Sequence, residues 1–176
     1  MRSLFIISTI IIFLFCACTS PSLGQNPDTP LQISADSECG FVWASEQLAD
    51  LSNKFDEKLK DIQPQANGYA EAYGENCIDI QGNNVRFLAM ETDFYVSLEV
   101  NELEDQQVLG ELTGQVLDVI AEFPTDETPG PQSGYVGITF VTHGNELRMR
   151  FSQTDAKAAI ENGLQGEELF NALQAK

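Results

Sequence analysis

Few residues of this chain could do chemistry, and the arginines are notable because basic residues are scarce. The chain has 9 Lys and Arg against 27 Asp and Glu. Arg86, Arg148 and Arg150 lie in segments where apolar and polar residues alternate, on the polar side of the alternation. Period-two alternation predicts half-buried strands, so we expect these arginines on the uncovered face of a sheet. A guanidinium binds a carboxylate through two parallel hydrogen bonds, which would suit a carboxylate or an acidic partner.

Tyrosines would strengthen such a surface, because they combine an apolar ring with a hydroxyl. The sequence therefore predicts a binding surface made of Arg86, Arg148, Arg150, Tyr95 and Tyr135. Tyr69 and Tyr73 could share the same face. The competing interpretation is that the arginines only form salt bridges with nearby Asp and Glu.

No other pattern points to catalysis or to a metal. His143 is the only histidine and precedes a Gly144-Asn145 turn, where an exposed turn residue is the simpler interpretation. The sequence has no Gly-x-Ser-x-Gly elbow, no glycine and lysine phosphate loop and no run of alternating Asp typical of a calcium loop. We predict no catalytic residue, no metal site and no cofactor.

The first eighteen residues have the layout of an export signal. Arg2 supplies a positive head, Leu4 to Phe15 carry no charge, and Ala17 and Cys18 follow. The apolar run is about a dozen residues, shorter than the roughly 20 that span a bilayer as a helix. A retained transmembrane anchor is therefore the weaker interpretation.

This leader resembles that of the bacterial lipoprotein class, in which a small residue precedes a cysteine that is lipid-modified after cleavage. Cys18 follows the small Ala17, whereas Cys16 follows the bulky Phe15. The class usually has Leu three residues before the cysteine, and Phe15 stands there. Ordinary secretion, without a lipid on Cys18, is the alternative.

The resemblance implies a signal peptide at 1–17 and a lipidated Cys18. A cysteine carrying two or more acyl chains, such as palmitate, gives stable membrane attachment. The protein would then be held in the cell envelope, with its domain on the extracytoplasmic side. Residues 18–36 contain three prolines among small polar residues, which predicts an extended spacer.

Two cysteines remain for the exported part of the chain, Cys39 and Cys77. An even pair in an oxidising compartment predicts a disulfide. Two cysteines and one histidine do not suit zinc, which usually takes four nitrogen or sulfur ligands.

Charge restricts the class of partner. The formal net charge is −18, and every Asp and Glu lies after residue 17. So acidic a protein does not suit nucleic acid, whose phosphates require Lys and Arg, nor anionic lipid head groups. A protein or a small molecule of the envelope is the expected partner.

The rest of the chain, 37–176, has the length of one domain and mixes helical and strand patterns. Helices are predicted at 41–62, 102–123, 154–163 and 166–175, and strands at 68–73, 77–80, 85–90, 94–100, 135–142 and 147–151. Trp43 would then contribute to core packing or to the start of the first helix. Gly110 and Gly114, four residues apart in the second helix, suggest close packing against a neighbour.

Strands joined by short turns pair antiparallel, and amphipathic helices need a face to cover. We therefore expect an α+β fold with an antiparallel sheet of four or five strands and helices packed on one face. Each long helix precedes a hairpin that opens with Gly-Tyr and turns at Gly-Asn. A duplicated helix-hairpin unit is one interpretation of this pattern, and ordinary turn chemistry is the other.

These features favour a membrane-tethered, non-enzymatic binding or accessory module. An envelope hydrolase that uses acidic residues in a cleft, and a purely structural envelope component, are the alternatives.

Overall fold

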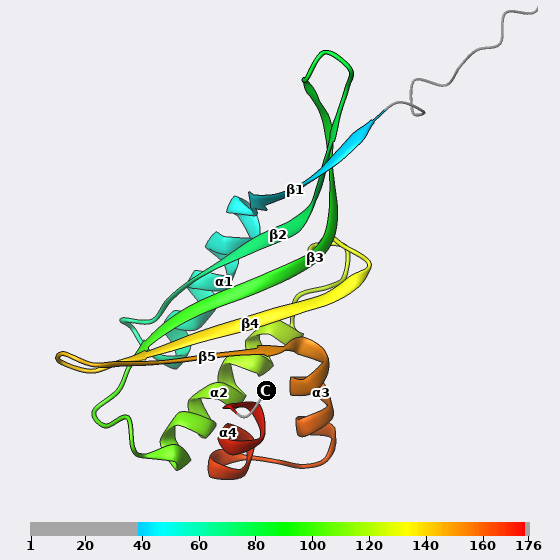
Figure 1. Cartoon of the computed structure of the whole chain (residues 1–176). Helices are drawn as coiled ribbons and strands as arrows, with labels where there is room; N and C mark the ends of the chain where they lie inside the picture. The colour runs from blue at the N-terminus through cyan, green and yellow to red at the C-terminus, as the bar shows by residue number, and fades with distance from the viewer. Residues whose placement is uncertain (1–38, 175–176) are drawn as a thin grey trace, which may run out of the picture. The chain divides into compact units, whose positions relative to one another are not determined.

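The computed structural model describes residues 39–174 and has the expected α+β fold (Figure 1). The predictions made for 1–17, Cys18 and 18–36 lie outside the described residues. In chain order the elements are β1 (Gly40–Gln47), α1 (Ala49–Ile62), β2 (Asn67–Ile78), β3 (Asn84–Glu99), α2 (Gln106–Ala121), β4 (Gln132–Val141), β5 (Glu146–Ser152), α3 (Gln153–Glu161) and α4 (Gly166–Gln174).

The five strands form one sheet in sequence order, β1-β2-β3-β4-β5. All neighbours pair antiparallel except β3 and β4, which pair parallel. This pair is the one departure from the expected antiparallel sheet. A helical crossover returns the chain to the same end of the sheet, so that the next strand runs parallel, and α2 is that crossover.

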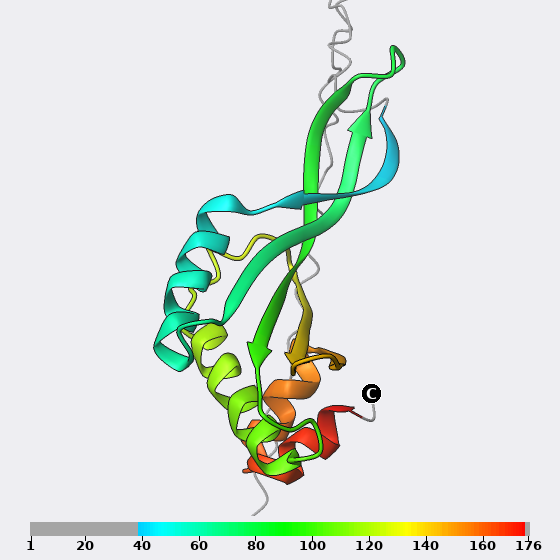
Figure 2. The same cartoon turned by 90° about the vertical axis from the view of Figure 1, so that its left-hand side faces the viewer.

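A single hydrophobic core lies between the sheet and the helices. Residues of all four helices join the inward side chains of β2 to β5 in it. Figure 2 shows α1 and α2 along one face of the sheet, which leaves the opposite face, here called the outer face, without a helical cover. The largest fully buried side chains are Phe55, Phe94, Phe140, Phe151, Phe170, Leu59, Leu98, Leu109, Ile138, Leu169, Leu173 and Val116.

The predicted start of the first helix is wrong. Residues 40–47 form the edge strand β1, and α1 begins only at Ala49. Phe41, Val42 and Trp43 belong to residue types that favour strands, and the regular apolar steps of the helix begin only beyond them. Trp43 is 72% exposed, so its predicted packing in the core is also wrong.

The strands are longer than predicted. β2 is continuous through 74–76 and β3 through 91–93, where turns or breaks were expected. A β-bulge explains the first difference, because the β2–β3 register shifts between Tyr73 and Gly74. A Cβ at position 74 would lie 2.0 Å from the carbonyl oxygen of Leu88, so the bulge needs glycine at this position.

Beyond the helices, three strands continue as an arm (Figure 1). We define the arm as residues 39–44, which include the first half of β1, together with residues 74–89 of the β2–β3 hairpin. The predicted disulfide between Cys39 and Cys77 is present, with a Cα–Cα distance of 5.1 Å. The disulfide ties Cys39, the first described residue, to Cys77 near the end of β2.

The order helix, strand, strand occurs twice, as α1-β2-β3 and α2-β4-β5. Because β3 and β4 are parallel, β2 and β4 run in opposite directions. One unit is therefore not a simple translation of the other along the sheet, and duplication stays a hypothesis.

The close packing expected at Gly110 occurs between α2 and α4. A Cβ at Gly110 would lie 1.8 Å from the carbonyl oxygen of Gly166, a backbone atom that cannot move aside. At Gly114 it would meet only the Leu169 side chain, at an ordinary 3.7 Å.

The two glycines therefore predict opposite effects of the same change. Gly110→Ala should destabilise the domain by about 1–3 kcal/mol, because the two helices must separate. Gly114→Ala is the matched control and should be neutral or stabilising by up to about 1 kcal/mol, since Ala favours the helix. Urea unfolding of both variants measures this, and equal stability of the two would contradict the packing described.

Candidate functional site

Two rows of residues cross the outer face of the sheet, and each row has one residue from each of the strands β2, β3, β4 and β5. The cross-strand partners in the first row are Tyr69, Tyr95, Gly137 and Arg150. Those in the second row are Asn67, Ser97, Thr139 and Arg148. Side chains directly opposite one another share a face and touch. The first row is therefore aromatic and the second is polar, and both end in arginine at β5.

The aromatic row is closely packed. The rings of Tyr69 and Tyr95 are stacked, with centroids 4.9 Å apart and 23° between the planes. Gly137 leaves room for the Tyr95 ring, because a Cβ there would lie 2.7 Å from Cδ1 of Tyr95. The stacked pair presents a flat apolar surface, with Tyr69 43% exposed.

Asp93 holds the arginine end of this row. Its carboxylate is fully buried, and burying a charge is costly unless donors surround it. Oδ1 accepts a hydrogen bond from the backbone N–H of Tyr135 at 2.7 Å. Oδ2 accepts from the hydroxyl of Tyr95 at 3.1 Å and from Nη2 of Arg150 at 3.1 Å.

A β-bulge brings Asp93 to this position. Two residues of β4, Gly134 and Tyr135, lie opposite the single Asp93 of β3. A Cβ at Gly134 would lie 2.6 Å from Oδ1 of Asp93, so only glycine allows this close approach. Bulges commonly re-aim a side chain in this way.

Arg150 is thereby fixed while remaining accessible. Its guanidinium carbon lies 3.7 Å from the centroid of the Tyr135 ring, a distance typical of a cation–π contact. The side chain is still 53% exposed. Burial lowers the pKa of Arg150, but Asp93 outweighs it and the net pKa is raised. Arg150 therefore stays charged, with donors left for a ligand.

The network extends to β2 through the tyrosine hydroxyls. The hydroxyls of Tyr95 and Tyr73 lie 3.3 Å apart, and Tyr73 donates to Oε2 of Glu71 at 3.0 Å. Burial raises the pKa of Tyr95, and the contacts with Tyr73 and Asp93 act in the same direction. Burial also raises the pKa of Glu91, as does its neighbour Asp93, while Arg150 opposes them. Because its pKa is raised, Tyr95 stays a neutral hydrogen-bond donor at neutral pH.

The two rows line an open groove of about 410 Å³. Ligand pockets commonly measure about 300–1,000 Å³. We call it the tyrosine–arginine groove, and its lining residues are Asn67, Tyr69, Tyr95, Val96, Ser97, Gly137, Ile138, Thr139, Arg148, Met149 and Arg150.

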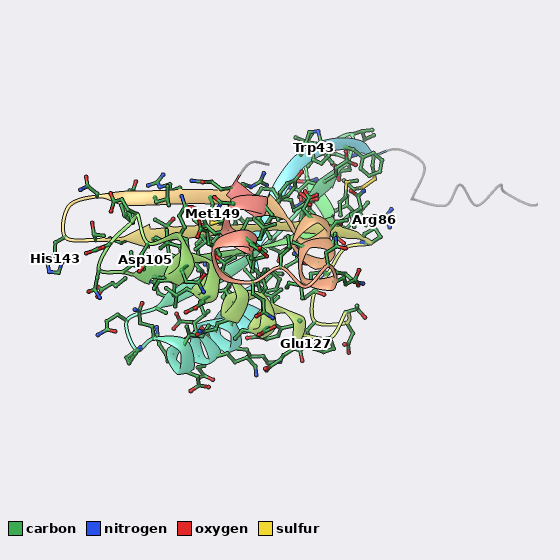
Figure 3. All side chains as sticks on the ribbon, turned by 90° about the horizontal axis from the view of Figure 1, so that it is seen from below. Trp43, Arg86, Asp105, Glu127, His143 and Met149 are labelled. Carbon is green, nitrogen blue, oxygen red and sulfur yellow. A yellow bond between two sulfur atoms is a disulfide. The ribbon has the colours of Figure 1, made fainter. Side chains whose placement is uncertain are left out.

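The structure brings together only part of the predicted binding surface. Tyr95, Arg148 and Arg150 line the groove, and the Tyr135 ring packs against the guanidinium of Arg150. Arg86 lies opposite Cys77 in the arm, nine residues from Tyr95 along β3, or about 30 Å at the usual strand rise. Figure 3 also places Arg86 toward the arm end of the sheet, away from Met149 of β5.

Salt bridges, the competing interpretation of the arginines, also occur. Arg150 pairs with Asp93, and Arg148 pairs with Glu146 at 2.8 Å. The Arg148 pair is exposed on both sides, so it contributes little to stability and can exchange partners.

Sequence reasoning missed Asp93, whose position within a strand gave no sign of its burial.

A larger hollow, of about 660 Å³, lies at the end of the domain opposite the arm. His143 lines it (Figure 3), on the β4–β5 turn where an exposed residue was expected. Its lining includes Gln63, whose side-chain amide bonds the backbone N–H and carbonyl of Glu99. It contains no arginine and no aromatic platform, so we favour the tyrosine–arginine groove although it is smaller.

Within residues 39–174, no three His, Cys, Asp or Glu side chains are grouped so that they could hold a metal ion. The helices of this same part of the chain are all too short or too polar to cross a membrane.

No family model, curated protein or solved structure matches the chain. The interpretation of the groove therefore depends on its own chemistry.

The raised pKa of Tyr95 predicts a loss of stability at alkaline pH. The unfolded chain ionises this tyrosine near pH 10, whereas the folded protein keeps it protonated. The resulting stability is complete below about pH 10 and falls as the pH rises, by up to about 1 kcal/mol per unit in this partly open site. Urea unfolding between about pH 9 and pH 11 should therefore be less pH-dependent for Tyr95→Phe than for the wild type. Equal pH dependence would contradict this.

Proposed function

We propose that the protein is a lipoprotein attached to the membrane through Cys18, and that its domain is a non-enzymatic binding module. The observation that carries the binding part is the arrangement of the tyrosine–arginine groove. It combines a flat aromatic surface, a row of neutral polar groups and two cationic ends on a rigid sheet.

The groove suits a ligand with matching parts. The Tyr69–Tyr95 stack offers a surface for the apolar face of a ring. Asn67, Ser97 and Thr139 offer both donors and acceptors for hydroxyl groups. Arg148 and Arg150 offer the forked donors that bind a carboxylate. An acidic sugar, with a ring, hydroxyls and a carboxylate, satisfies all three.

The acidic groups at the site favour binding over hydrolysis. Asp93 already accepts three hydrogen bonds and has no exposed surface, so it is poorly placed to exchange protons with a substrate. Its geometry is that of a residue that orients Arg150. This supports a ligand-holding role rather than an envelope hydrolase.

The tether is supported by the leader and by the disulfide. Cys39 and Cys77 are paired, which suits a domain that resides in an oxidising compartment. Together with the resemblance of the leader to the lipoprotein class, this supports a domain on the extracytoplasmic side of the cell envelope, held by acyl chains on Cys18.

Mass spectrometry of the membrane-extracted protein tests the tether. The mature chain should begin at Cys18 and carry the mass of its acyl chains. Cys18→Ala should lose that mass, and the matched variant Cys16→Ala should keep it, because residue 16 lies within the cleaved leader. An unmodified wild-type protein would contradict the proposal.

Amide NMR of the labelled protein, titrated with glucuronate, tests the ligand class. We expect the backbone signals of Ser97, Gly137 and Thr139 to shift with glucuronate and much less with neutral glucose. Arg148→Glu should weaken glucuronate binding about tenfold or more, since it replaces a charge-assisted hydrogen bond with a repulsion.

Lys157→Glu is the matched control. It makes the same charge change at an equally exposed side chain on α3, where Lys157 pairs with Glu161, and should leave binding unchanged. Equal weakening by both variants would indicate a general charge effect, and no shifts in the groove would refute the proposed ligand class.

A further inference from the structure

The exposed apolar side chains of the domain are concentrated in the arm. Trp43 is 72% exposed, Ile80 77%, Val85 60%, Val42 56% and Phe41 53%. Large apolar side chains gathered on a protruding element usually mark a contact with a partner or a membrane.

These side chains occupy both faces of the arm and its tip. Phe41 and Trp43 alternate with Val42 along β1, so they point to opposite sides of the sheet. Val42 lies on the same side of the sheet as Phe87, because both are cross-strand partners of Asn76. Ile80 lies in the turn between β2 and β3. A rigid partner with one flat surface could cover one of these three surfaces but not all of them.

The arm is also the part of the domain that lies nearest to the proposed tether along the chain. The described chain begins at Cys39, which the disulfide holds against Cys77 near the arm's tip. Twenty residues separate Cys18 from Cys39, and a spacer of that length would span about 25 Å on average if it behaved as a random coil. An acyl-anchored Cys18 would therefore connect to the domain through the arm, and not through the helical layer.

We propose that the arm contacts the surface of the lipid bilayer to which the protein is attached. This inference rests on the proposed tether at Cys18. Tryptophan prefers the membrane–water interface, where its ring is buried and its N–H stays hydrated. The contact is shallow, because Asp79 and the backbone of β1, the edge strand of the described sheet, require water or head groups.

The tether makes a weak contact sufficient. Attachment at Cys18 turns arm binding into an intramolecular event, with an effective concentration in the millimolar range. The acidic domain would be repelled by anionic head groups, and contact of the arm with lipid would oppose this repulsion. The tyrosine–arginine groove lies on the outer face of the sheet and would remain open.

Trp43 reports on this contact directly, because it is the only tryptophan in the chain. The full-length lipidated protein is reconstituted into phosphatidylcholine vesicles with either ordinary or brominated acyl chains. If the arm contacts lipid, Trp43 emission should be lower in the brominated vesicles than in the ordinary ones, since Trp43 would lie at the membrane–water interface. Ile80→Asn with Val85→Thr should reduce this quenching, while Ile160→Thr, a change at an exposed residue of α3, should not.

The outcomes separate the contact from the tether. Protein that floats with the vesicles but shows equal emission in both lipids overturns the arm contact and leaves the tether intact. A concentration-dependent blue shift without quenching also overturns it, and would indicate pairing of the β1 edge with another protein strand. Protein that does not float overturns both.

Discussion

The carboxylate of Asp93 is fully buried on the side of the sheet that no helix covers, and a buried charge is tolerated only when donors surround it. The three donors come from three different strands: a backbone N–H of β4, a hydroxyl of β3 and a guanidinium of β5. Satisfying this one group therefore fixes the bulge in β4, the orientation of Tyr95 and the position of Arg150. The tyrosine–arginine groove exists because these three constraints hold together.

The same arrangement explains how an acidic chain can present a cationic site. On so acidic a surface, an arginine without such support would form an ion pair with the nearest exposed carboxylate. Arg150 instead has its carboxylate partner below it, in the sheet, and the Tyr135 ring against its guanidinium. The Arg150 side chain still lines the groove. One-sided helical packing is the second requirement, since a helix over the outer face would fill the groove.

Much of the fold was predictable because it depends on local patterns. Helix α2, the β4–β5 hairpin and the Cys39–Cys77 disulfide follow from apolar spacing, turn residues and cysteine count. Residues 41–47 were mispredicted because their apolar residues stand directly before the apolar stripe of the helix, although their β propensity and their pairing with β2 decide for a strand. The parallel β3–β4 pair depends on where α2 docks, which no local pattern records.

The site was predictable in its residue types but not in its arrangement. Arginines and tyrosines on the polar side of strands were readable from alternation, and Tyr95, Tyr135, Arg148 and Arg150 do lie near one another. Arg86 does not, because β3 is one long strand that carries it into the arm. Asp93 could not be found, since a carboxylate within a strand normally points to solvent, and its burial depends on a bulge and on Gly134, far along the chain.

A double-mutant cycle on Asp93 and Arg150 tests this account most directly. Urea unfolding of Asp93→Asn, Arg150→Ala and the double variant gives the coupling free energy of the pair. We predict a coupling of about 1–3 kcal/mol, and a much smaller one for the exposed Glu146–Arg148 pair. Equal, near-zero coupling of both pairs would contradict the claim that buried Asp93 organises the site.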